Sequence, residues 1–202
     1  MKITLASTLI LLTLLFACQY DQNKGVILTV SIGDNPTIDT IFITNYDNYD
    51  DFAYMTKNEN GFFKDTLSFN TGFYYLDIGS EYSIIYLEIG YNLNITIDNY
   101  HLFNESIRVI SGDDKHVNQY LFDYVLNKNQ KLKADRLIDL EKDEYQLEIG
   151  RFKLEENQNI EKLKLKPETA EFLLNLLDED LENTTIMYDQ EYEFKYLMDT
   201  IP

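Results

Sequence analysis

The chain has 202 residues and a formal net charge of −18, with one cysteine and two histidines. Nucleic acid and anionic membrane surfaces both repel so acidic a protein, and we therefore expect no nucleic-acid partner. A single cysteine excludes an intramolecular disulfide and a CxxC redox pair, while His101 and His116 are too few for a multi-histidine metal site.

Residues 1–17 are typical of a secretory signal peptide. Lys2 supplies the positive start, and an apolar run from Ile3 to Ala17 follows, interrupted only by Thr and Ser. The run is shorter than the roughly 20 apolar residues that a membrane-spanning helix needs. The segment Leu15-Phe16-Ala17-Cys18 resembles the lipobox of bacterial lipoproteins. This resemblance implies that Cys18 is diacylated and becomes the first residue of the mature protein.

Lipidation at Cys18 would attach the protein to a membrane of the cell envelope through its acyl chains, with residues 18–24 as a linker. Gln19 stands where some inner-membrane lipoproteins carry a retaining aspartate, which favours the outer membrane. The side of the membrane that the protein faces stays open. An ordinary signal peptide, with a cysteine near its cleavage site by chance, is the alternative.

The segment 25–111 has the pattern of short β-strands separated by turns. Leu93, Ile95 and Ile97 alternate with polar residues, as in a strand with one face in water. Gly-, Asn- and Asp-rich turns separate the strands, and we expect an antiparallel β-sandwich. The predicted strands are Val26–Ile32, Ile38–Thr44, Tyr49–Met55, Phe62–Phe69, Phe73–Ile78, Ser83–Ile89, Leu93–Asp98 and Ile107–Ile110. Their many Tyr and Phe residues are interpreted as cross-strand packing.

The segment 112–202 changes to a helical period. A variant capping box from Ser111 to Asp114 predicts the start of a first helix. A second helix is expected from Arg136 to about Leu165. Gly150 and the polar Lys142 and Glu156 interrupt its apolar stripe, so we expect it to bend or break, and Pro167 begins a third helix. Asn183-Thr184-Thr185 is expected to interrupt that helix, with a last short helix over 186–198. The predicted fold class is thus α+β, a β-sandwich followed by a helical C-terminal segment.

Residues 25–130 resemble the N-terminal β-domain and following helices of Bacteroidota thioredoxin-like (TlpA-type) lipoproteins. The segments that carry the resemblance are Gly72–Gly79, Tyr86–Gly90, Asn94–Asp98, Phe103–Ile107, Ser111-Gly112 and Asn118–Leu121. Ile89 and Tyr91 replace the proline and aspartate of the family's turn. The family's C-terminal thioredoxin domain and its CxxC pair would be expected near Pro202. Because the chain has no cysteine after Cys18, that family's activity is not transferred to any residue here.

Other candidate sites have simpler interpretations. The acidic segment Asp47–Asp51 lacks the spacing of a calcium loop and is interpreted as a solvated loop. The acidic residues Asp178–Glu182 are placed late in a helix, as a solvated face or a surface for a basic partner. His116 is interpreted as a surface residue. We therefore predict no catalytic, metal-binding or cofactor-binding residue, and Cys18 is the one predicted site.

These observations favour a non-enzymatic accessory or interaction module of the cell envelope, with a protein partner of unknown identity. One alternative is a truncated or split part of a thioredoxin-like thiol-disulfide oxidoreductase whose CxxC domain is missing. The other is a glycan- or small-ligand-binding lipoprotein that uses the tyrosine-rich sheet. The absence of Trp argues against a sugar-stacking platform.

Overall fold

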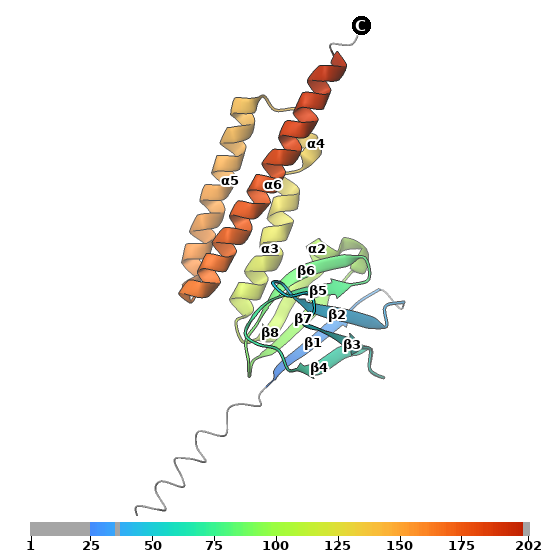
Figure 1. Ribbon diagram of the computed structural model, residues 1–202. Coiled ribbons are helices and arrows are strands. Elements are labelled where there is room, and N and C mark those ends of the chain that lie inside the picture. Colours follow the sequence, from blue (N-terminus) through green and yellow to red (C-terminus); the bar gives the residue numbers. More distant parts are fainter. Residues whose placement is uncertain (1–24, 35–36, 200–202) are drawn as a thin grey trace, which may run out of the picture. The chain divides into compact units, whose positions relative to one another are not determined.

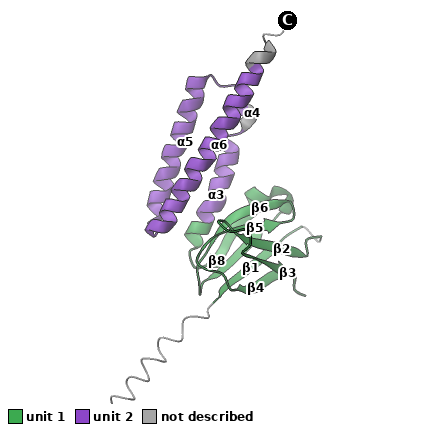
Figure 2. Ribbon diagram, in the orientation of Figure 1, with its two compact units in different colours: residues 1–118 green, residues 119–202 purple. Residues whose placement is uncertain are grey.

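The computed structural model describes residues 25–34 and 37–199 (Figure 1). The predicted signal peptide, Cys18 and the linker 18–24 lie outside this range, as do residues 35, 36 and 200–202. The chain forms two compact units, one ending at Asn118 and the other beginning at Gln119 (Figure 2). Each unit is described by itself below.

The first unit contains all eight predicted strands, arranged in two sheets of four. The strands are β1 (Val26–Ile32), β2 (Thr40–Asn45), β3 (Phe52–Thr56), β4 (Phe62–Leu67), β5 (Gly72–Ile78), β6 (Glu81–Leu87), β7 (Asn92–Ile97) and β8 (Ile107–Gly112). One sheet has the order β4-β1-β7-β8 and the other the order β3-β2-β5-β6. A short 3₁₀ turn (Tyr100–Leu102) and helix α2 (Phe103–Ser106) connect β7 to β8.

The α+β class is confirmed, but only one of the two sheets is antiparallel throughout. In the other, β1 runs parallel to β7, with Val30 opposite Ile95, so that sheet is mixed. Side-chain alternation indicates which residues face the core, whereas the direction of a neighbouring strand depends on the connection between them. Five strands lie between β1 and β7 in the chain, four of them in the other sheet and β4 beside β1, and this long connection lets β7 return parallel to β1.

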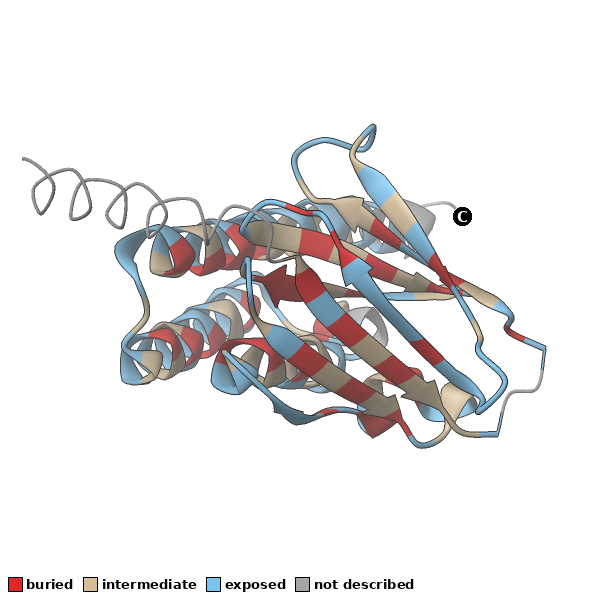
Figure 3. Ribbon diagram, turned by 90° about the horizontal axis from the view of Figure 1, so that it is seen from below, coloured by how far each residue is buried: buried red, intermediate tan, exposed pale blue. Residues whose placement is uncertain are grey.

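Along most of the described strands, buried residues alternate with more exposed ones, as Figure 3 shows. Leu28, Val30, Ile41, Ile43 and Ile85 are completely inaccessible to solvent. Burying each such side chain contributes about 1.5–3 kcal/mol, which makes this apolar core the main source of the unit's stability. Strand residues between the buried ones point outward, so each sheet has one outer face.

The side chain of Asn118 forms hydrogen bonds with the backbone of Tyr86 on the edge strand β6. Asn118 lies in the first turns of helix α3 (Lys115–Lys131), and its side chain is only 1% exposed. Its Oδ1 accepts a hydrogen bond from the Tyr86 N–H at 2.8 Å, and its Nδ2 donates to the Tyr86 carbonyl at 2.9 Å. The amide thus bonds the same two backbone groups that a neighbouring strand would bond.

The second unit is helical, as the change of period predicted. It contains most of α3, the short α4 (Ala134–Leu137), α5 (Lys142–Leu163) and α6 (Pro167–Asp199). Lys164 ends α5 in the left-handed conformation at φ 53°, and Pro167 begins α6 as predicted. Within residues 25–34 and 37–199, none of the helices combines the length and the apolar character that crossing a membrane requires.

Helices α5 and α6 pack antiparallel to each other. Tyr145, near the start of α5, stacks on Tyr188 with ring centroids 3.7 Å apart. Lys153, which follows Tyr145 in α5, forms an ion pair at 2.6 Å with Asp178, which precedes Tyr188 in α6. The two contacts thus proceed in opposite directions along the two helices, as in an αα-hairpin.

Two predicted helix boundaries are wrong. Ser111 lies in β8 and does not cap a helix, because the strand continues to Gly112. The helix expected from Arg136 is divided into α4 and α5 by the segment 138–141, whereas Gly150 lies inside an uninterrupted α5. A single glycine costs a helix interior only about 1 kcal/mol, which packing against a neighbouring helix offsets.

The interruption expected at residues 183–185 is also wrong, because α6 is continuous. The hydroxyl groups of Thr184 and Thr185 donate to the carbonyl oxygens of Asp180 and Leu181, each at 2.8 Å. These bonds to the preceding turn satisfy the polar side chains inside the helix.

Asn118→Ala should lower the free energy of unfolding by about 2–4 kcal/mol, because the N–H and the carbonyl of Tyr86 both lose their buried partner. Asn129→Ala is the matched control, since Asn129 lies on the same helix and is exposed. It should change the free energy by less than about 0.5 kcal/mol. Urea denaturation measures both values, and an equal effect of the two variants would contradict this role of Asn118.

Candidate functional site

The outer face of the sheet β4-β1-β7-β8 is mainly polar. Its strand β7 confirms the predicted wet face, because Leu93, Ile95 and Ile97 are buried while the residues between them are not. Ile27, Phe62 and Ile110 are apolar exceptions on this face. The polar residues at outward positions are Thr29, Ser31, Lys64, Thr66, Asn92, Asn94, Thr96, Arg108 and Ser111.

The outer face of the other sheet, β3-β2-β5-β6, is rich in aromatic rings. Phe52, Tyr54 and Tyr82 are 59%, 60% and 61% exposed, respectively. We call this surface the aromatic face. Its outward positions carry Thr40, Phe42, Thr44, Phe52, Tyr54, Thr56, Phe73, Tyr75, Asp77, Tyr82 and Ile84, whereas Tyr86, at the same parity on β6, is buried. The interpretation of the aromatic residues as packing alone is therefore incomplete, because many of them line the surface.

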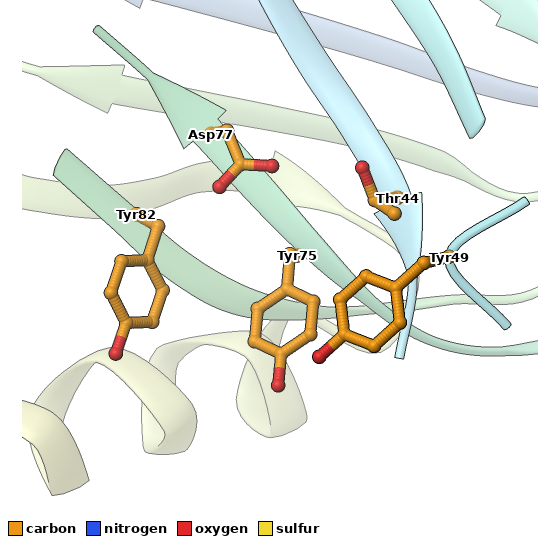
Figure 4. Close-up of a pocket in the computed structure, with 5 residues that line it drawn as sticks. All are labelled: Thr44, Tyr49, Tyr75, Asp77 and Tyr82. Carbon is orange, nitrogen blue, oxygen red and sulfur yellow. The ribbon is translucent and has the colours of Figure 1, made fainter. Parts of the chain in front are cut away.

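The centre of the aromatic face is hollowed (Figure 4). The hollow has a volume of about 330 Å³ and is lined by Thr44, Tyr49, Tyr75, Asp77 and Tyr82. Figure 4 shows the three tyrosine rings in a row, with their hydroxyl groups pointing away from Asp77. Tyr75 is central, because its ring lies 6.0 Å from that of Tyr49 in a stacked arrangement and 5.9 Å from that of Tyr82 in an edge arrangement.

The strand register brings the lining residues together. Thr44 on β2 lies opposite Tyr75 on β5, and Asp77 on β5 lies opposite Tyr82 on β6. The two-residue turn between β5 and β6 holds this second pairing, and Gly79 meets the turn's requirement for a positive φ with a value of 65°. The hollow is therefore built mainly on strands, which hold side chains more rigidly than loops do.

The hairpin loop between β2 and β3 supplies the remaining rings. Asn45 Oδ1 accepts hydrogen bonds from the backbone N–H groups of Asp47 and Asn48 at 2.9 and 3.0 Å, which folds the loop tightly. Tyr46 then stacks on Tyr75 with centroids 5.0 Å apart, and Tyr49 follows. The acidic segment 47–51 is thus a turn that presents tyrosine rings to the sheet.

Burial shapes the ionisation of the hollow. Partial burial raises the pKa of the Asp77 carboxyl above its usual range. Burial, together with hydrogen bonding to Tyr49, also raises the pKa of Tyr75, so its phenol stays neutral. Within the described residues, the Asp77 side chain makes no hydrogen bond or ion pair. The hollow therefore contains one unpaired carboxyl group beside aromatic rings.

The groups around the hollow are suited to binding. Rings offer stacking faces, and Thr44 and Asp77 offer hydrogen-bonding oxygens. His101 and His116 are exposed, and neither lines the hollow. Across residues 25–34 and 37–199, no group of three His, Cys, Asp or Glu side chains is arranged to hold a metal ion.

The acidic cluster at residues 178–182 belongs to helix packing. It lies in the middle of α6, and not late in a helix as predicted, because α6 continues to Asp199. Asp180 accepts hydrogen bonds from the Tyr124 hydroxyl at 2.7 Å and from Lys128 Nζ at 2.8 Å. These contacts between helices leave the cluster less free for a basic partner than the sequence suggested.

Glu156 is a buried polar residue that the sequence pattern indicated only as an interruption of the apolar stripe of α5. Its side chain is 0% exposed, and its Oε2 accepts a hydrogen bond from the Tyr120 hydroxyl at 3.2 Å. Its Oε1 has no hydrogen-bond partner in the described part of the chain. Burial and the nearby Glu156 raise the pKa of Tyr120. Glu156 does not line the hollows beside Leu132, Ile149 and Ile160 in the helical unit.

Sequence reasoning missed the residues of the hollow, although a signal was present. In Phe73-Tyr74-Tyr75-Leu76, apolar residues occupy positions of both parities, so they cannot all face one core. Tyr74 and Leu76 are buried, which leaves Phe73 and Tyr75 on the outer face. Cys18, the one site residue predicted from the sequence, lies outside the described residues.

No family model, no curated protein and no solved structure matches this chain. The resemblance to thioredoxin-like lipoproteins therefore stays a prediction.

Asp77→Asn should raise the melting temperature at pH 7. Because folding raises the pKa of this carboxyl, its charged form costs stability above the folded-state pKa. The cost disappears below the unfolded-state pKa of about 3.9, so the variant's advantage should shrink as the pH falls and vanish by about pH 3.

Thermal unfolding followed by circular dichroism at both pH values measures this difference. Asp65→Asn is the control, because Asp65 lies exposed on β4 and its replacement changes the net charge equally. A gain for Asp65→Asn as large as that for Asp77→Asn would show that net charge, and not the hollow, is responsible.

Proposed function

We propose that this chain is a lipid-anchored, non-catalytic interaction module of the cell envelope, and that its aromatic face binds a partner protein. The observation that carries the proposal is the difference between the two outer faces. One is mainly polar, whereas the other exposes a nearly continuous set of aromatic rings, among them Phe42, Phe52 and Tyr54. Contiguous exposed apolar surface on a soluble domain is typical of an interaction site.

The composition of the aromatic face supports a protein as the occupant. Tyrosine and phenylalanine are enriched in the cores of protein interfaces, where tyrosine often contributes a large share of the binding energy. The rings extend from Phe52 and Tyr54 on edge strand β3 to Tyr82 on β6. Their distribution over all four strands suits a broad partner surface.

The predicted anchor adds a constraint on where binding occurs. With Cys18 acylated, the segment from Cys18 to Gly25 would span at most about 28 Å when fully extended. The first unit, which contains the two sheets, would therefore remain close to the membrane and would bind its partner there.

A glycan or small ligand is the second candidate. The exposed rings of Tyr49 and Tyr82, at 68% and 61%, favour it, because sugars stack on such surfaces. An oligosaccharide that protects these rings from chemical modification, with no protein bound to the face, would favour this candidate over the first.

The aromatic face can be tested by photo-crosslinking in cells. Replacing Tyr54 with a benzophenone-bearing amino acid should give a covalent adduct with one predominant protein, because Tyr54 is exposed on this face. The matched position is Lys64, which is exposed on the outer face of the other sheet. Adducts of equal yield from both positions, or none from Tyr54, would refute the proposal.

The anchor is tested separately with a fatty-acid analogue. The wild-type protein should become labelled and fractionate with membranes, and Cys18→Ala should lose the label, since Cys18 is the only thiol in the chain. A wild-type protein that stays unlabelled, or a Cys18→Ala variant that is labelled equally, would disprove lipidation at this residue.

A further inference from the structure

We infer that the hollow lined by Thr44, Tyr49, Tyr75, Asp77 and Tyr82 receives the guanidinium group of an arginine side chain from the partner protein. The inference rests on the proposed function, since it names the group that the aromatic face recognises.

Charge favours a cationic group. Strands β2, β3, β5 and β6 contain no lysine or arginine, and neither does the hairpin loop 46–51. The same elements contain Asp77 and Glu81, and the loop contributes three further aspartates. With a net charge of −18 over the whole chain, the long-range field also attracts a basic partner and repels an acidic one.

The rings of the hollow offer faces to a cation. Tyr49 and Tyr75 are stacked with an interplanar angle of 16°, and Tyr82 meets Tyr75 at 72°. A cation over the face of one of these rings is attracted to it through the ring quadrupole.

Asp77 supplies the counter-charge. It lies directly opposite Tyr82 in the β5–β6 pairing and opposite Phe42 in the β2–β5 pairing, so it stands among aromatic neighbours. A partly desolvated carboxylate with no partner in the described chain is stabilised when a cation donates hydrogen bonds to it.

Arginine fits this combination better than lysine or a neutral sugar. Its planar guanidinium stacks on a tyrosine ring while two of its N–H groups donate to one carboxylate, and it is more weakly hydrated than an ammonium. A lysine would pair as a point charge without the planar stacking. A neutral sugar would leave the charge of Asp77 unpaired.

The recognition can be measured with a defined probe. The full chain, isotopically labelled and purified from membranes in detergent, is titrated by NMR with a Gly/Ser peptide that carries one arginine. The same peptide with citrulline keeps the shape and removes the charge. The arginine peptide should bind at least about ten times more tightly, with shifts concentrated in β5 and β6. Equal affinities, or shifts located elsewhere, would overturn the inference.

Variants of the hollow distinguish the contribution of the Asp77 charge to peptide binding from that of the Tyr82 ring. Asp77→Asn should weaken binding of the arginine peptide about tenfold or more, whereas the control Asp65→Asn should leave it unchanged. Tyr82→Phe keeps the ring and should bind within about twofold of wild type, while Tyr82→Ser should lose several-fold. Each variant's melting temperature confirms that it is folded. If Asp77→Asn binds as tightly as wild type, the inference is wrong.

The crosslinking assay distinguishes failure of this inference from failure of the proposed function. With the photoreactive residue at position 54, Asp77→Asn should reduce the adduct about tenfold. An adduct that forms equally with Asp77→Asn would overturn the arginine inference and leave the aromatic face as an interaction surface. Absence of any adduct in the wild-type background would overturn both.

Discussion

The alternation of buried and exposed side chains along eight short strands is the constraint on which the rest of the first unit depends. Most strands contribute alternate residues to an apolar core, with Leu28, Val30, Ile41, Ile43 and Leu76 fully buried. The remaining residues must face outward, whatever their chemistry. One sheet uses these positions mainly for Thr, Ser, Asn and charged residues, as solvation favours. The other exposes aromatic rings, and this exposure is the feature that calls for a functional explanation.

The hollow also contains a residue whose environment costs stability. Asp77 is partly desolvated, and burial raises its pKa, so the folded chain holds this carboxyl at a cost in stability. Such a cost is common where binding, and not folding, sets the choice of residue. Glu156 is a second buried acid with an unpaired oxygen, yet it lies among packed helices and does not line the hollows beside Leu132, Ile149 and Ile160. Position on an exposed aromatic face is what separates Asp77 from Glu156.

Much of the fold could be predicted from the sequence because its signals are local. Alternation located all eight strands, and Pro167 marked the start of α6. The parallel pairing of β1 with β7 depends on a long-range connection, which no local pattern reports. Helix α6 continues through Thr184 and Thr185, whose hydroxyl groups bond to the preceding turn, and composition alone does not reveal this. The hollow needed strand register as well, because Asp77 and Tyr82 become neighbours only once the β5–β6 turn is placed.

The most direct measurement of the central claim uses a single introduced thiol. Cys18 is the only natural cysteine and is expected to be acylated, so Thr56→Cys on the aromatic face and Lys64→Cys on the other sheet would each carry one reactive group. Maleimide labelling is compared between native membranes and the purified protein. Our account predicts that Thr56→Cys is protected in membranes and reactive after purification, whereas Lys64→Cys reacts in both. Equal reactivity of Thr56→Cys in both preparations would contradict the claim that the aromatic face is an occupied binding surface.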